Sequence, residues 1–312
     1  TGTGSFDSWV SADYFLATST TATSTFAGGF AIETSGFVYD HSTNYVGIGM
    51  TTPNNLLSVY DLIDFNNTNF NTKLGYQAGK NIASGAQYNT FLGYQSGYSS
   101  STASTNAAEN NVAIGYQTLY SNTTGYDNLA IGMNALYSNT TGSNNSAQGM
   151  NALFSNTTGA FNTGLGMNAG YDINTALGTG ANTIIGYNTG RGITTGVNNT
   201  ILGANVTGLA AGLSNNIILA DGAGNRRINV DSSGNLGIGT TSPYAKLSIE
   251  GTTGSANNLL NIDFSSDGIS TSTAMVINST GNIGIGTTSP GATLSVTGTG
   301  AFDSWLSADY FL

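Results

Sequence analysis

The segments NVAIGYQTLYSNTTGYD (111–127), NLAIGMNALYSNTTGSN (128–144) and NSAQGMNALFSNTTGAF (145–161) are consecutive copies of one 17-residue unit. Aligned on the glycine after the apolar pair, the unit recurs from Gly75 to Gly203, at intervals of 18, 22, 17, 17, 17, 20 and 17 residues. A constant unit with occasional insertions is typical of a solenoid. Seventeen residues of mostly extended chain cover about 50 Å, enough for one circuit of a narrow coil. We therefore predict an all-β, parallel β-solenoid in which Asn-Thr-Thr-Gly forms a corner of each coil.

The composition agrees with many short strands joined by turns. Of 312 residues 44 are Gly, and 7% are charged, against about 25% in an ordinary soluble domain. The six basic residues are scattered and the net charge is −10, which makes nucleic acid an unsuitable partner. Cys is absent, so disulfides and thiolate metal sites are excluded. The sequence contains no run of 18 apolar residues, so it predicts no membrane span.

The apolar residues of each coil fall on both sides of the predicted strand. Val112 and Ile114 point one way and Ala113 the other, because side chains alternate along a strand. A monomeric solenoid needs only an apolar interior, so the second face predicts a partner, and small residues there would let backbones approach closely. We therefore expect self-association. The residues expected to pack in the core or between copies are Ala113, Ile114, Ala130, Ile131, Ile184, Ile185, Ile201 and Leu202.

A column of Tyr and Met follows the glycines. Columns of like residues arise in any solenoid, so we interpret this one as a stabilising ladder. An aromatic strip can also bind carbohydrate, and in that case Tyr94, Tyr116 and Tyr187 are the ligand contacts.

The two ends of the chain repeat each other. Residues 1–16 (TGTGSFDSWVSADYFL) and 297–312 (TGTGAFDSWLSADYFL) are identical at 14 of 16 positions. We interpret the chain as one period, plus overlap, of a longer tandem array. The aromatic residues of 5–16 lie near helical spacing and predict a short helix or turn, with a strand as the alternative.

A second motif occurs three times, as YVGIGMTTPNNLLSV (45–59), NLGIGTTSPYAKLSI (235–249) and NIGIGTTSPGATLSV (282–296). Its apolar-Gly alternation, Pro turn and short strand predict a small β-meander. The expected division is a junction at 1–30, a meander module at 31–72, the solenoid at 73–220, two further modules at 221–260 and 261–296, and the next unit from 297 to 312.

The repeated apolar-Gly-[Tyr/Met] pattern with Asn-rich turns over residues 73–220 resembles the head of trimeric autotransporter adhesins. The stretch ILADGAGNRRINVDSSGNLGIGTTSP (218–243) is similar to segments of phage tail fibres and large bacterial surface proteins. The first resemblance implies a left-handed β-roll, with three chains side by side on a bacterial surface. The adhesin coil is shorter than 17 residues, so the likeness is to the architecture.

Candidate catalytic residues are few. His41, the single histidine, aligns with Asp231 and Asn278 at the start of a tight turn, so we interpret it as a turn residue. The acid pairs Asp61/Asp64 and Asp263/Asp267 are the candidates for glycoside hydrolysis. Because LIDFNN (62–67) and NIDFSS (261–266) are copies of one strand end, we expect these aspartates to be structural.

The expected cofactor content is none, with a structural calcium ion in the turns DGAGN (221–225) and DSSGN (231–235) as the alternative. Asn122, Asn139, Asn156 and Asn198 lie in N-x-S/T sequons, whose glycosylation depends on the host.

The sequence thus predicts a non-enzymatic structural unit of a long extracellular fibre or adhesin. It would form a homotrimer at a cell or virion surface and serve attachment or spacing. Its partners are further copies of the chain and a host-surface glycan or protein, with the inserted loops 97–110 and 171–180 as contacts. The alternative is a phage tail fibre or tailspike that binds or cleaves surface polysaccharide.

Overall fold

The computed structural model describes residues 30–32, 37–40, 42–53, 57–59, 63–66, 69–82, 85–99, 108–251, 257–264 and 272–297. The helix or turn predicted for 5–16 and the repeated terminal segment lie outside these residues. All regular elements that the structure describes are strands, which confirms the all-β prediction. The chain forms two compact units, residues 1–68 and 69–312.

The first unit holds the strands β1 (Phe30–Ile32), β2 (Phe37–Asp40), β3 (Tyr45–Ile48), β4 (Leu57–Val59) and β5 (Ile63–Asn66). The solenoid strands of the second unit are β6 (Asn71–Leu74), β7 (Thr90–Leu92), β8 (Val112–Ile114), β9 (Leu129–Ile131), β10 (Ser146–Gln148), β11 (Thr163–Leu165), β12 (Thr183–Ile185), β13 (Thr200–Leu202) and β14 (Ile217–Ala220). They are followed by β15 (Arg226–Val230), β16 (Leu236–Ile238), β17 (Leu247–Ile249), β18 (Leu260–Phe264), β19 (Ser272–Ile277), β20 (Ile283–Ile285) and β21 (Leu294–Val296).

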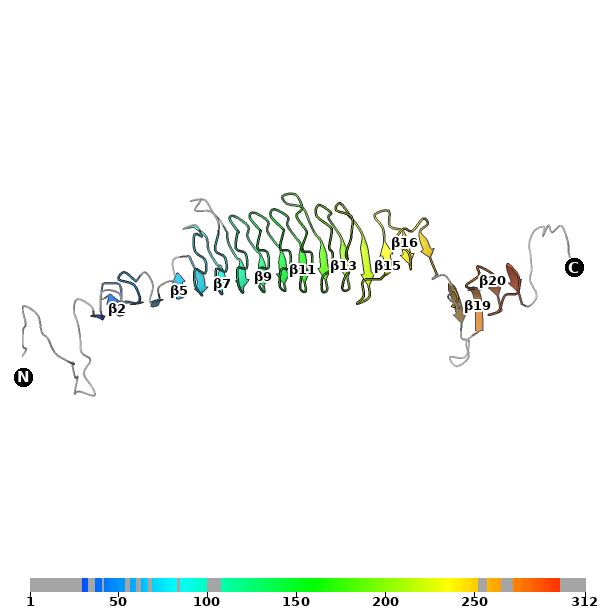
Figure 1. Cartoon of the computed structure of the whole chain (residues 1–312), viewed down its shortest axis with the longest axis horizontal. Helices are drawn as coiled ribbons and strands as arrows, with labels where there is room; N and C mark the ends of the chain where they lie inside the picture. The colour runs from blue at the N-terminus through cyan, green and yellow to red at the C-terminus, as the bar shows by residue number, and fades with distance from the viewer. Residues whose placement is uncertain are drawn as a thin grey trace, which may run out of the picture. The chain divides into compact units, whose positions relative to one another are not determined.

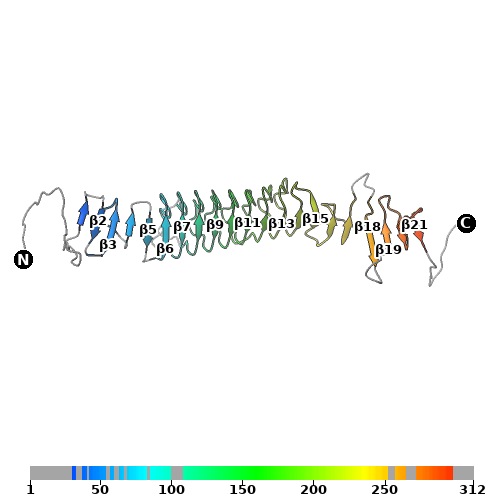
Figure 2. The ribbon, with the colours of Figure 1, turned by 90° about the horizontal axis from the view of Figure 1, so that it is seen from below.

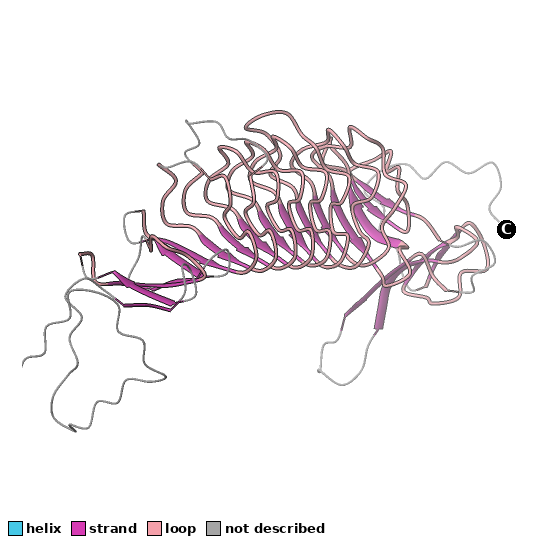
Figure 3. Cartoon of the chain, turned by 60° about the vertical axis from the view of Figure 1, so that its left-hand side comes forward, coloured by secondary structure: helices cyan, strands magenta, loops and turns pink. Residues whose placement is uncertain are grey.

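The predicted parallel solenoid is present. Strands β6 to β14 pair in parallel and in register, so that Ala113 lies beside Ala130 and Ala130 beside Ala147. Figures 1 and 2 show these strands in a row, one per coil. Figure 3 shows the strands along one wall and the loops that close each coil.

The glycine column fixes how closely successive coils approach. Eight glycines, from Gly75 to Gly203, have φ between 117° and 137°, a region that L side chains rarely adopt. A Cβ on Gly132 would lie 2.8 Å from the carbonyl carbon of Gly149, and one on Gly166 would lie 2.6 Å from the oxygen of Gly186. The corner therefore packs backbone against backbone, and glycine is required there by both conformation and space.

The core of the solenoid runs inside the coils. Its strand column is Ala113, Ala130, Ala147, Gly164, Ile184, Ile201 and Ile218, and it meets Leu119, Leu136, Leu153, Ile173 and Ile193 from the loops. Small and large residues complement each other. Gly164 leaves room for Leu153, and Gly190 leaves room for Ile184, where an added Cβ would lie 2.9 and 2.7 Å from the respective side chains.

This placement corrects the expectation that the small residues face a partner. Ala113 and Ala130 are 0% exposed within a single chain, because the opposite wall of the narrow coil fills the space beside them. The outward residues of the same strands form the second apolar face instead.

A buried asparagine ladder, which the sequence analysis did not predict, lies beside the core. Its members are Asn71, Asn89, Asn111, Asn128, Asn145, Asn162, Asn182, Asn199 and Asn216. In the middle of the ladder, Asn145 Oδ1 accepts the backbone N–H of Asn162 at 2.9 Å, and its Nδ2 donates to the carbonyl of Gly159, also at 2.9 Å. Asn145 thus links its own coil to the next and closes its own loop, and Asn89, Asn111, Asn128 and Asn182 do the same. Burial of this polar column is tolerated because both ends of these amides are bonded.

The Asn-Thr-Thr-Gly corner is confirmed, with its asparagine turned inward. Asn122 Nδ2 donates to the carbonyl of Gly125 at 2.8 Å, and Asn139 Nδ2 donates to Asn122 Oδ1 at 2.9 Å. The N–H groups of Thr123 and Thr124 both point to the carbonyl of Thr140, at 2.8 and 3.1 Å. The side chain therefore closes the turn while the backbone bonds the following coil.

The three GIG modules differ from the predicted meander in one strand. In each, the first two strands are antiparallel (β2–β3, β15–β16, β19–β20), but the third pairs in parallel (β3–β4, β16–β17, β20–β21). The loop between β16 and β17 returns the chain to the starting edge, as a coil of a solenoid does. A Cβ on Gly237 would lie 2.6 Å from the Thr240 carbonyl, Pro243 is buried, and Ser248 Oγ accepts the N–H of Tyr244. These contacts explain the Gly, Pro and Ser of the motif.

The glycine column predicts that Gly132→Ala lowers the free energy of unfolding by about 3 kcal/mol or more, since it adds strain and a backbone clash. Gly212→Ala is the control, because its Cβ would meet nothing closer than 3.9 Å; we expect a change below about 1 kcal/mol. Urea unfolding measures both. Equal effects of the two changes would contradict the account of the corner.

The asparagine ladder predicts that Asn145→Ala costs about 3 kcal/mol, because it leaves the N–H and the Nδ2 of Asn162 buried without their acceptor. The Gly159 carbonyl loses one of its two side-chain donors and keeps Asn156 Nδ2. The control is Asn258→Ala, at an exposed asparagine, which should change stability by less than about 0.5 kcal/mol. Thermal unfolding followed by circular dichroism makes the comparison. A ladder variant as stable as the control would show that the amides add little.

Candidate assembly surface

The outward side of the solenoid strands is an uncharged, mostly apolar face. It consists of two columns, which we call the strand face. The first column is Thr72, Thr90, Val112, Leu129, Ser146, Thr163, Thr183, Thr200 and Ile217, and the second is Leu74, Leu92, Ile114, Ile131, Gln148, Leu165, Ile185, Leu202 and Leu219. Exposure reaches 43% at Leu165 and 45% at Ile217. A contiguous exposed patch of such side chains is often an interaction surface.

The strand face continues into β15, β16 and β17 through the strand register. Ile217 lies opposite Val230, which lies opposite Leu236, and Leu236 lies opposite Leu247. Residues opposite each other in a sheet share one face. Twelve strands at a spacing of about 4.8 Å, with two columns about 7 Å apart, give a strip of roughly 400 Å². That lies in the range of the largest apolar patches of typical monomers, about 300–600 Å², which are often functional.

The residues that the sequence predicts to pack in the core or between copies fall into two groups. Ala113, Ala130, Ile184 and Ile201 are buried in the core. Ile114, Ile131, Ile185 and Leu202 lie on the strand face, where Ile131 and Leu202 are each 37% exposed.

The Tyr/Met column lies beyond the glycine corner and is also exposed. Tyr94 stacks on Tyr76 at 5.4 Å and on Tyr116 at 5.2 Å between ring centroids. Both ring faces of Tyr94 are therefore covered by its neighbours, and its edge faces outward. Tyr187 is about half exposed, and Ala204 occupies the same place in the next coil. Together with the strand face, this column gives the solenoid two adjacent apolar sides that meet at the glycine corner.

A second aromatic column follows the loops, in the order Tyr98, Tyr120, Tyr137, Phe154 and Tyr171, with centroids 4.9–5.2 Å apart. The Arg191 guanidinium lies 4.6 Å from the centroid of the Tyr171 ring and pairs with Asp172 at 2.8 Å. Burial acts to raise the pKa of Asp172, but hydrogen bonds from Arg191 and Gly192 outweigh it and hold this pKa below its usual value. The column thus ends in a cation that both stacks and pairs.

The candidate catalytic residues are not brought together by the described part of the chain. His41, Asp61 and Asp267 lie outside it, and the side chain of Asp64 is not described. Asp263 is exposed and accepts hydrogen bonds from Asn261 and Thr273. This geometry fits the structural role expected for Asp263.

The alignment of His41 with Asp231 and Asn278 is wrong by one residue. Val38 faces Gly47, as Asn229 faces Gly237 and Val276 faces Gly284, so Asp40 corresponds to Asp231 and Asn278. The turn between β2 and β3, counted from Val38 to Gly47, is one residue longer than the equivalent turns between β15 and β16 and between β19 and β20. Counting back from Gly47 without a gap therefore reaches His41 instead of Asp40. Asp40 accepts the N–H and Oγ–H of Ser42 at 2.8 and 2.7 Å, and these bonds lower its pKa.

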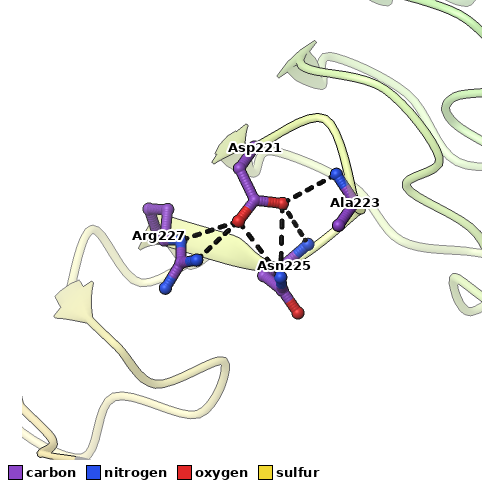
Figure 4. A network of polar contacts seen from close by, with 4 residues as sticks. All are labelled: Asp221, Ala223, Asn225 and Arg227. Atoms are coloured by element: carbon purple, nitrogen blue, oxygen red, sulfur yellow. Dashed lines mark hydrogen bonds and ion pairs between the residues drawn. The ribbon is translucent and has the colours of Figure 1, made fainter.

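The turns considered for calcium are occupied by donors. Figure 4 shows Asp221 accepting hydrogen bonds from Ala223 N, Asn225 N, Asn225 Nδ2 and the Arg227 guanidinium, whose Nε lies 3.0 Å from Oδ2. Asp231 accepts the N–H groups of Ser233 and Asn235 at 2.9 Å. Carboxylate oxygens bonded in this way do not present the open oxygen set that calcium takes. No group of three or more His, Cys, Asp or Glu suited to a metal ion occurs among the described residues.

Three of the four sequons named above are unsuited to glycosylation in the folded chain. Asn122, Asn139 and Asn156 are buried in the Asn-Thr-Thr-Gly corner, whereas Asn198 is exposed and donates to Asn215. In the described ranges no helix is long and apolar enough to cross a membrane.

A scan against models of known protein families finds no match, and a search of curated proteins finds no significant match either. The stacked coils are compatible with a repetitive β-roll protein, the coarser part of the resemblance.

The turn in Figure 4 predicts an acid-sensitive end to the solenoid. Hydrogen bonds from Asn225 and Arg227 hold the pKa of Asp221 well below its usual range. A carboxyl whose pKa is lower in the folded chain than in the unfolded chain stabilises the fold at pH values above its unfolded pKa, about 3.9. That stability is lost as the pH falls from there toward the folded pKa. We expect the melting temperature, measured by calorimetry, to fall more between pH 4 and pH 2 in the wild type than in Asp221→Asn. Glu250→Gln, at an exposed carboxylate, is the control and should follow the wild type. If Asp221→Asn also shows the wild-type dependence of melting temperature on pH, the prediction is contradicted.

Proposed function

We propose that this chain is a structural repeat unit of a long extracellular fibre or adhesin at a cell or virion surface, in which three copies assemble along their solenoids. The observation that carries the proposal is the strand face, an uncharged apolar strip along twelve strands of a chain with a net charge of −10. The net negative charge opposes the approach of copies, and burial of the apolar side chains of this strip favours contact along it.

The two apolar sides support a closed ring of copies, of which a trimer is the smallest. The strand face and the Tyr/Met column meet at the glycine corner, so each chain offers one side to each of two neighbours. A ring closes under this arrangement, and three is the smallest ring in which each chain contacts two others. The resemblance to adhesin heads implies the same number.

The work of such a unit is mechanical. Every coil is bonded to the next by strand pairing, the asparagine ladder and the loop backbone, so length is gained one coil at a time. The 1–16 and 297–312 repeat supports units joined end to end. Attachment falls to the irregular loops, where Leu177, in the 171–180 insertion, is 69% exposed.

The tail-fibre alternative requires a site for polysaccharide on the Tyr/Met column. Sugar rings stack on open aromatic faces, and both faces of Tyr94 are covered by Tyr76 and Tyr116. The stacked part of the column, Tyr76 to Tyr116, is therefore better suited to packing edge-on against a neighbouring chain.

Assembly is tested with Ile131→Asp combined with Leu202→Asp, which places two charges on the strand face. We expect the wild type to sediment with three times the chain mass and the variant with one, since a buried unpaired carboxylate opposes association. The matched control is Leu177→Asp combined with Tyr244→Asp, at exposed apolar residues away from both sides. Circular dichroism checks that all three are folded. A variant that still assembles, or a wild type that never does, contradicts the proposal.

The two functions are separated by replacing Tyr94, Tyr116 and Tyr187 with Ala. The fibre proposal predicts weaker assembly, by at least tenfold in the association constant, as the second apolar side is lost. The tail-fibre alternative predicts that assembly is retained while binding to an array of bacterial surface glycans disappears. Sedimentation and array binding of the same samples distinguish them.

A further inference from the structure

The four-stranded sheet β18–β21 carries its apolar residues on one face. Ile262 lies opposite Met275, Met275 opposite Ile285, and Ile285 opposite Val296. Leu260, Ile277, Ile283 and Leu294 form the neighbouring row on the same side. We call these eight residues the module face; none of them is charged.

The module face has no cover of its own. Ile262 is 47% exposed, Ile285 45% and Leu294 59%. Val276, on the other side of the sheet, is the one apolar residue among the described residues of these strands that is buried. A sheet needs an apolar face packed on something to be stable in water, and one buried valine is too small a core for four strands.

The same pattern occurs in the other modules. In β15–β17 the corresponding rows are Val230, Leu236 and Leu247 beside Ile228, Ile238 and Ile249, continuous with the strand face. The loop of each module packs on its opposite side, where Gly284 leaves space for the carbonyl of Thr287 and where Pro290 is buried. The motif therefore closes one side of the sheet and leaves the other apolar each time.

We propose that the module face is an interface with the same sheet of further copies of this chain, and that β18–β21 becomes stably ordered only when the copies assemble. This inference rests on the proposed self-assembly and adds that the solenoid folds within one chain whereas the module does not. Further copies fit best because the uncharged face of an acidic chain meets uncharged surface of its neighbours in the assembly without charge repulsion. By the same strand and column spacings the face is about 130 Å², and it adds to the strand face as part of the roughly 800 Å² per partner of a stable interface.

Hydrogen exchange on the full chain tests this directly. The assembled wild type is compared with the Ile131→Asp, Leu202→Asp variant, which keeps β18–β21 unchanged but removes assembly. We expect amides of β19 and β20 to exchange at least a hundredfold faster in the variant, while amides of β9 and β10 stay protected in both, since the solenoid core is internal to the chain.

The converse variant, Ile262→Asn combined with Ile285→Asn, should lower the association constant at least tenfold and leave β19 unprotected at every concentration. Tyr244→Asn, at a residue 93% exposed in a loop, is the control and should change neither. If β19 is equally protected in assembled and unassembled chains, the inference is overturned while the proposed function stands. If the chain assembles but β19 exchanges freely, the module face has no copy on it and the inference is again overturned. A wild type that never assembles overturns both.

Discussion

Backbone contact at the glycine corner is the constraint on which the rest of the structure depends. Because Gly115, Gly132 and Gly149 adopt positive φ and carry no Cβ, the carbonyl of each following coil can lie against the one before it. Coils at that separation pair in register, strand to strand. Register places like residues in columns, and the columns then decide what is buried, what is bonded and what faces outward.

The inward columns of residues stabilise the single chain, and the outward columns form its exposed surface. Ala113 and Leu119 fill the interior, and the asparagine ladder satisfies the loop backbone beside them. Cohesion within one chain is thus complete without the outward residues. The strand face is consequently free to serve assembly, and its apolar character across β6–β17 has no explanation in the fold of a single chain. We therefore propose that the function of this protein depends on association through a surface that recurs along the chain.

The sequence predicts the solenoid well and its interior less well. The 17-residue spacing of glycines is a backbone requirement, so it is visible without knowledge of side-chain packing. Which side of the strand faces inward depends on the opposite wall: Ala113 is a core residue because Leu119 and its equivalents supply the missing volume. The asparagine ladder is a column at a constant offset from the glycines, and that periodicity was the available signal. The parallel third strand of the GIG modules and the role of Asp40 depend on loop lengths, which the motif alone does not determine.

The most direct test of the account is the mass per unit length of the solenoid section, measured by electron microscopy of unstained particles. Seventeen residues per rise of about 4.8 Å give roughly 0.36 kDa per Å for one chain. The account predicts three times this value, about 1.1 kDa per Å. A value for a single chain would contradict it and would mean that the strand face remains open or is covered by something other than a copy of the chain.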